Sequence, residues 1–152
     1  MIDDILNTLT KDGDGSVLLA KPASVRDLEN VQKRLGEMGI PALPKGYIDF
    51  LAKHNGYAFD GIEFFGTKKK PERGTNYVLN DIISENEEFI RRNKDSINNV
   101  NSYVFLGSGS ESLYVYNTKN QRYEILDFTD RREYGSFETF DGLFAELVSE
   151  WV

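Results

Sequence analysis

The sequence predicts a single α+β domain over residues 1–152, with a central antiparallel sheet of about four to six strands flanked by N-terminal, middle and C-terminal helices. Apolar residues recur at helical spacing near both ends of the chain and in stretches between them. Three short runs of aromatic and β-branched residues follow one another between residues 103 and 128, which is typical of a strand meander. Helices clustered at the ends with strands between them favour α+β over α/β.

The composition indicates one globular domain with a real core, because 39% of the 152 residues are hydrophobic and 28% are charged. No run approaches the ~18 apolar residues of a membrane helix. The acidic N-terminus does not have the pattern of a signal peptide. The chain has no cysteine, which excludes disulfides and thiolate metal sites and fits a reducing cytosol. We therefore expect a soluble cytoplasmic protein.

The N-terminal part predicts two helices, over residues 2–9 and 24–38. Between them, residues 11–15 resemble the start of a calcium loop, but the closing glutamate is missing, so we expect a solvated turn. Ser24 with Asp27 three residues later resembles a capping box.

The stretch of residues 43–66 predicts a helix, a stop and a strand. Pro44 suits the first helical position, and Asn55-Gly56 supplies a left-handed stop. Gly61 then precedes an aromatic strand over residues 62–65. The residues that we assign to this structural motif are Leu43, Pro44, Tyr47, Phe50, Leu51, Asn55, Gly56, Gly61 and Gly66.

The rest of the chain predicts alternating polar segments and short elements. They are an exposed basic loop over residues 67–74, a helix over 81–92, a polar loop over 93–102, strands over 103–106, 113–116 and 123–128, and a helix from Thr139, its N-cap, to 151.

The motif at residues 43–66 resembles the signature of the SUKH superfamily, with its Leu-Pro opening, Phe-Leu helix, Asn-Gly stop and glycine-bounded strand. The likeness continues through a helix around Asn86 to the ending at residues 136–140, and it covers roughly residues 24–151. That superfamily holds bacterial immunity proteins against secreted toxins and a fungal regulator of cell-wall assembly. The resemblance implies a single domain of that kind, acting by binding proteins.

No catalytic set emerges from the residues. The only histidine, His54, lies on the apolar edge of a predicted helix, where a structural or surface role is the simpler interpretation. Residues 107–110 resemble a phosphate loop, but a strand follows them instead of a helix, so we expect a hairpin turn. We expect no catalytic residue, no metal and no cofactor; a hydrolase using two of the 25 acidic residues stays as a weaker alternative.

The charge favours a basic protein partner, because 25 acids against 18 bases give a net charge of −7. The same charge disfavours nucleic acid and anionic membranes, although it could simply keep the protein in solution. We expect an immunity protein that blocks a toxin, such as a nuclease; the alternative is a regulatory scaffold of the cell-wall type. The candidate contact residues are Glu63, Glu111, Asp130, Glu133, Tyr114 and Tyr116, of which the two tyrosines share a strand face that is either exposed or core.

Overall fold

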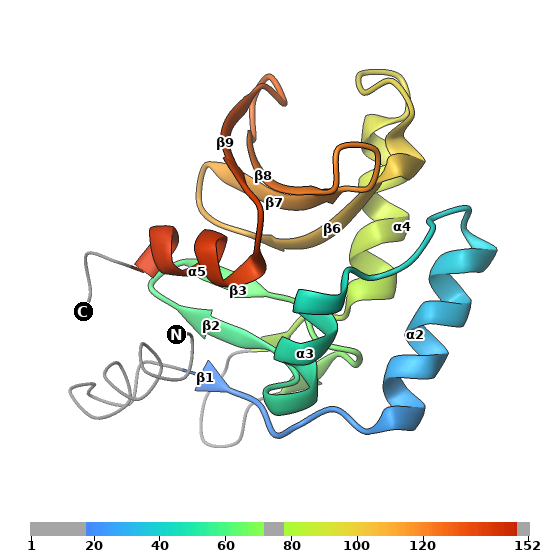
Figure 1. Ribbon diagram of the computed structural model, residues 1–152, viewed down its shortest axis with the longest axis vertical. Helices are drawn as coiled ribbons and strands as arrows, with labels where there is room; N and C mark the ends of the chain where they lie inside the picture. The colour runs from blue at the N-terminus through green and yellow to red at the C-terminus, as the bar shows by residue number, and fades with distance from the viewer. Residues whose placement is uncertain (1–17, 72–77, 149–152) are drawn as a thin grey trace.

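The computed structural model describes residues 18–71 and 78–148 and confirms the predicted α+β class (Figure 1). The expected N-terminal helix, the turn at 11–15 and the end of the last helix beyond residue 148 lie outside the described residues. No helix in the described part of the chain is both long and apolar enough to cross a membrane.

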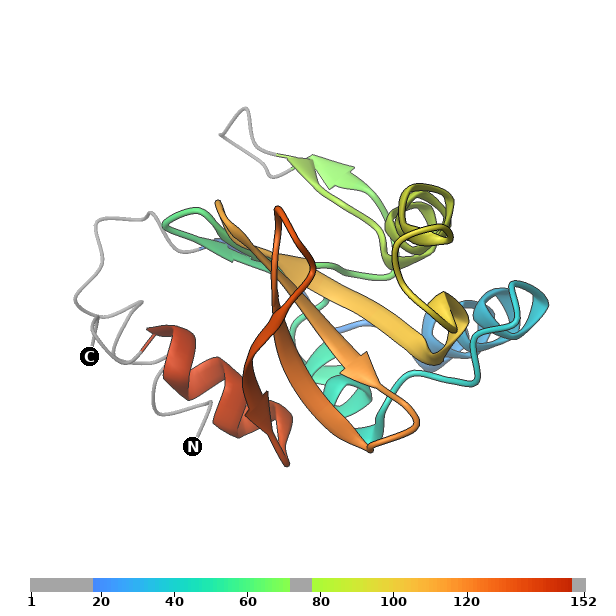
Figure 2. The same cartoon turned by 90° about the horizontal axis from the view of Figure 1, so that it is seen from above.

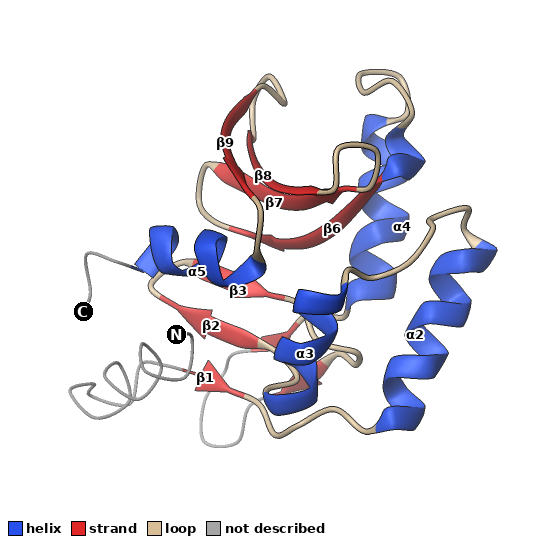
Figure 3. Cartoon of the chain, viewed as in Figure 1, coloured by secondary structure: helices blue, strands red, loops and turns tan. Residues whose placement is uncertain are grey.

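The main sheet is antiparallel and has seven strands in the order β1-β2-β3-β6-β7-β8-β9 (Figure 3). Six of these strands have three residues or more, and β1 is a two-residue strand at one edge. The strands are β1 Leu18–Leu19, β2 Tyr57–Phe59, β3 Ile62–Phe64, β6 Tyr103–Ser108, β7 Ser112–Asn117, β8 Arg122–Asp127 and β9 Glu133–Phe137.

Three strands of this sheet, β1, β2 and β9, were not expected from the sequence, whereas β3 lies within the predicted strand over residues 62–65. β2 and β3 form a hairpin whose two-residue turn is Asp60 and Gly61, with φ of 51° and 82°. Positive φ at both turn residues is the signature of a type I′ turn, which explains the glycine. β9 occupies the segment that we expected only to lead into the last helix.

A loop was predicted over residues 67–74, and its described part, residues 67–71, is not simply an exposed loop. Thr67 is buried, and its N–H donates to Asn55 Oδ1 at 2.7 Å. β4 (Lys70–Pro71) then pairs with β5 (Val78–Leu79) as a separate two-stranded sheet. Gly66 is required here, because a Cβ at this position would lie 2.2 Å from the carbonyl oxygen of Asn55.

The helices agree closely with the sequence expectations. They are α2 Val25–Glu37, α3 Lys45–Lys53, α4 Ile82–Asn93 and α5 Phe140–Val148, with a short 3₁₀ turn, η1, at Val100–Ser102. Ser24 caps α2, Asp81 caps α4, and the Thr139 hydroxyl accepts from the N–H of Gly142. Pro44 has an extended ψ of 149° and is the residue before α3, one position earlier than expected.

The helices cover both faces of the sheet, with α3 and α5 on one face and α4 on the other (Figure 2). Tyr47 and Phe50 of α3 pack with Phe140 of α5, at ring distances of 5.1 Å in both cases. The Tyr47 hydroxyl is within hydrogen-bond distance of the Phe65 and Leu106 carbonyls. The four apolar side chains of the α3 motif, Leu43, Tyr47, Phe50 and Leu51, are all buried.

On the opposite face, the amide of Asn86 joins α4 to β6. Its Nδ2 donates to the Phe105 carbonyl at 2.9 Å, and its Oδ1 accepts from the Phe105 N–H at 2.8 Å. The same Nδ2 lies 2.8 Å from the Ile82 carbonyl, and the side chain is fully buried. One side chain therefore satisfies both backbone groups of a core strand residue.

We expect Asn86→Ala to lower the free energy of unfolding by about 2–6 kcal/mol, because the Phe105 N–H and carbonyl would each be buried without a partner. The measurement is the midpoint of urea unfolding, compared between proteins whose free energy of unfolding falls with urea at the same slope. Asn30→Ala makes the same change at an exposed position of α2 and should shift stability by no more than about 0.5 kcal/mol. Equal stability of the two variants would contradict the role given to Asn86.

Candidate protein-binding site

Two turns lie side by side at one end of the sheet. The turn between β6 and β7 contains Glu111, whose carbonyl accepts from the Phe128 N–H at 3.0 Å. Phe128 opens the turn between β8 and β9, which is closed by an Asp127 N–H to Arg132 carbonyl bond of 2.8 Å. The Tyr134 hydroxyl also hydrogen-bonds to the Ser112 hydroxyl. We call residues 109–112 and 127–134 the turn edge.

The turn edge exposes two large aromatic side chains. Only four large hydrophobic side chains are exposed in the described residues, and Phe128 and Tyr134, at 50% and 58%, are two of them. The other two, Val25 and Val78, lie on α2 and β5. Exposed aromatic rings are the usual anchors of protein interfaces.

Acidic side chains lie beside one of these rings, that of Tyr134. Glu111, Asp127 and Asp130 line a surface hollow of about 480 Å³ together with Arg132 and Tyr134. Asp127 Oδ1 also accepts from the N–H of Thr129 at 2.7 Å, so its carboxylate helps to fix the turn. Two of the predicted contact residues, Glu111 and Asp130, are therefore brought together here.

The other predicted contact residues lie elsewhere. Glu63 is only 7% exposed and accepts hydrogen bonds from the N–H and Nδ2 of Asn80, at 2.7 and 3.0 Å. Tyr114 is 3% exposed, packs 5.4 Å from Phe64, and has its pKa raised to about 12, chiefly by burial. Both side chains belong to the interior, so we leave them out of the candidate site.

Tyr116 and Glu133 take intermediate positions. The Tyr116 ring is half-buried and packs 4.8 Å from that of Tyr123. Glu133 is exposed on β9, and after burial its charge is the next largest factor that raises the pKa of Glu124. Glu133 therefore stays with the turn edge as an acidic residue at its boundary.

A second hollow, which no sequence pattern indicated, lies between α4 and the turn edge. It has a volume of about 200 Å³, and we call it the α4 groove. Phe89 and Phe105, stacked at 5.0 Å, form part of its lining, and Phe128 of the turn edge also lines it. Arg131 lies over the Phe128 ring, 5.4 Å from its centroid, and its Nε donates to Asn93 Oδ1 at 2.6 Å.

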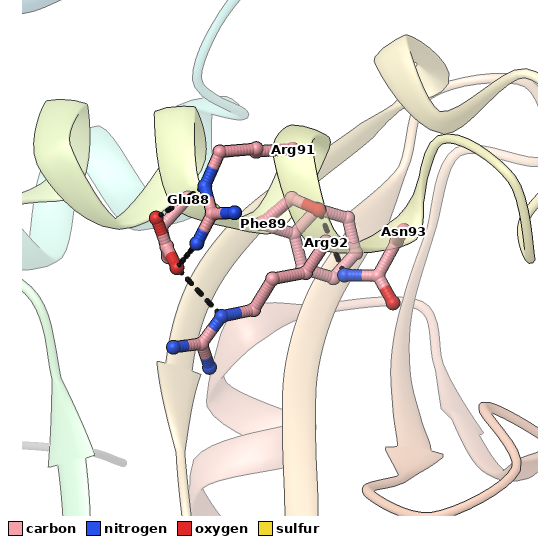
Figure 4. Close-up of polar contacts among 5 residues, drawn as sticks. All are labelled: Glu88, Phe89, Arg91, Arg92 and Asn93. Atoms are coloured by element: carbon pink, nitrogen blue, oxygen red, sulfur yellow. Dashed lines mark hydrogen bonds and ion pairs between the residues drawn. The ribbon is translucent and has the colours of Figure 1, made fainter.

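Two glutamates of α4 line this groove in different electrostatic states. Glu88 accepts from Arg92 Nε at 2.6 Å and from Arg91, which together lower the pKa of its carboxyl (Figure 4). The Glu85 carboxylate has no hydrogen bond or ion pair within the described residues. Burial, followed by the charges of Glu63 and Asp81, raises the pKa of the Glu85 carboxyl.

The turn edge and the α4 groove offer surfaces for binding, and the single histidine lies apart from them. His54 is the C-cap of α3, with its ring 6.0 Å from that of Phe50, away from the turn edge. Within residues 18–71 and 78–148, no group of three or more His, Asp or Glu side chains is placed to hold a metal ion.

Comparison with known proteins gives one family. The model of the SMI1 / KNR4 family (SUKH-1) matches residues 22–146, which is most of the chain and includes every element from α2 to β9. A search of curated proteins finds no match. The family match confirms the resemblance drawn from the motif at residues 43–66.

The two groove glutamates should affect stability with opposite signs. Folding raises the pKa of Glu85, so at a pH above the ordinary carboxyl pKa of 4.5 its ionisation lowers the stability of the folded state. Glu85→Gln should therefore keep or raise the melting temperature near neutral pH. Folding lowers the pKa of Glu88, so its charge adds stability above that value, and Glu88→Gln should lower the melting temperature there.

Melting curves between pH 4 and pH 7 check these two predictions, and each variant serves as the control for the other. The differences in melting temperature from wild type should shrink toward the low end of that range, where carboxyl groups ordinarily take up protons. A Glu85→Gln protein that melts lower than Glu88→Gln near neutral pH would contradict these assignments.

Proposed function

Because this chain belongs to the SMI1 / KNR4 family (SUKH-1), we propose that it is an immunity protein, which binds a toxin and blocks it without catalysis. The observation that carries the proposal is the turn edge, which holds two exposed aromatic side chains and several carboxylates. Zero cysteines suit a cytoplasmic protein that meets the toxin after its entry.

The aromatic side chains supply the anchors of the proposed interface. Phe128 and Tyr134 are already held in place before binding, by Arg131 over the Phe128 ring and by the Ser112–Tyr134 hydrogen bond. Preorganised side chains lose less conformational entropy on binding, so more of their contact energy appears as affinity.

The carboxylates indicate the chemistry of the partner. Glu111, Asp127 and Asp130 lie on the same hollow, and the whole chain has a net charge of −7. A basic surface would be attracted at long range and would then find acidic groups at the contact. Nucleases carry such surfaces for nucleic-acid phosphates, so a nuclease toxin is the partner class that we favour.

A regulatory scaffold is the alternative within protein binding, and it would use the same surface on a host protein. The two functions are separated by the partner recovered, because a scaffold would retain host enzymes and protect against no toxin.

The test is co-expression in a bacterial host with a candidate nuclease toxin domain, such as one encoded beside the gene of this chain. We expect growth to be rescued and the two proteins to co-purify. Phe128→Ala should weaken binding by about 1–3 kcal/mol, as for an interface anchor, while the matched control Val25→Ala should change it by less than about 0.5 kcal/mol. Toxicity that the wild-type chain does not relieve would contradict the immunity role, and equal loss in both variants would contradict the turn edge as the contact.

A further inference from the structure

The α4 groove contains a charge that the fold leaves without a counter-ion. Glu85 is half-buried, and its carboxylate makes no hydrogen bond or ion pair with the described residues. Its neighbours Glu63 and Asp81 are also acidic, and their effect on its pKa exceeds that of the more favourable Lys69 and Arg92. A half-buried carboxylate in this setting lowers stability, so its presence needs an explanation outside folding.

The arginines around the groove are engaged by other residues, and Lys69, whose charge also favours ionised Glu85, forms no ion pair with it in the described part of the chain. Arg92 donates its Nε to Glu88 at 2.6 Å, and Arg91 also bonds to Glu88 (Figure 4). Arg131 is held by Asn93 and by the Phe128 ring. A cation from outside the chain is therefore the group that would complete the site at Glu85.

The walls of the groove favour a guanidinium over an ammonium. Phe89 and Phe105 line the groove but are almost wholly buried, at 3% and 7% exposed, whereas Phe128, which also lines it, is 50% exposed and offers aromatic surface. A planar guanidinium can stack on a ring while it donates to a carboxylate. Arg131 on Phe128 is an example of such stacking at the same groove.

The size and position of the groove point to a side chain of the bound protein. Its volume of about 200 Å³ is below the ~300–1,000 Å³ of pockets for drug-sized ligands, and it suits one long side chain. Phe128 belongs both to the groove and to the turn edge, so a protein bound on that edge passes the groove.

We propose that the α4 groove receives an arginine side chain of the partner protein, with the Glu85 carboxylate as its counter-ion and the exposed Phe128 ring as its aromatic wall; this rests on the proposed function. Glu85 would then be a specificity determinant, because a partner without a correctly placed arginine would leave this carboxylate unpaired.

The test uses N-acetyl-arginine amide as the probe and follows the NMR signals of the full chain. We expect saturable shifts at Phe89, Phe105 and Phe128. N-acetyl-citrulline amide, a neutral compound of the same shape, should bind about tenfold more weakly, since a hydrogen bond between charged groups is lost. Glu85→Gln should weaken arginine-amide binding by a similar factor and remain folded, whereas Glu87→Gln, on the exposed side of the same helix, should bind as wild type does.

Three outcomes would overturn the proposal: no saturable shift, equal binding of the citrulline compound, or wild-type binding by Glu85→Gln. Much tighter binding of free L-arginine than of the blocked amide would also overturn it, since the groove would then recognise an amino acid. If the probe fails while Phe128→Ala still weakens toxin binding, only the arginine site is lost and the proposed function stands.

Discussion

The rest of the structure depends on one buried amide, that of Asn86. β3 pairs with β6 only at Glu63–Ser108 and Phe64–Gly107, so Phe105 has β7 on one side and no strand on the side that faces β3. Asn86 donates to the Phe105 carbonyl and accepts from its N–H, as a neighbouring strand would. Because Asn86 belongs to α4, these bonds also fix the helix that carries Glu85 and Phe89. The same interaction that closes the core therefore positions one wall of the groove.

The bend of the sheet supplies the other wall. The register shifts between Phe105 and Gly107 and again between Ile125 and Leu126, and such bulges bend and twist strands. Figure 1 shows β7, β8 and β9 curving round so that the β8–β9 end approaches α4. Arg131 completes this approach through its bond to Asn93, near the C-terminal end of α4. The turn edge and the groove are thus neighbouring parts of one surface, with Phe128 shared by both.

Local patterns in the sequence were sufficient for the helices and the central strands, since apolar spacing and capping residues act within a few positions. The hairpin of β2 and β3 had a local signal as well, Asp60-Gly61, which is a strong hairpin dipeptide between two apolar runs. The burial of Glu63 and Tyr114 had no local signal in the sequence, because it depends on contacts with residues distant in the chain, Asn80 for Glu63 and Phe64 for Tyr114. The α4 groove could not be predicted, since it is formed by a helix and a hairpin about 40 residues apart and depends on how far the sheet bends.

The central claim is that the turn edge and the α4 groove together form the partner-binding face. Hydrogen–deuterium exchange of the chain, alone and with the candidate toxin domain, tests it directly. Bound toxin should slow exchange in residues 109–113 and 127–134 and along α4, and leave β1 and β2 at the opposite edge unchanged. Protection confined to β1 and β2 or to α2, with unchanged exchange at the turn edge, would contradict the account.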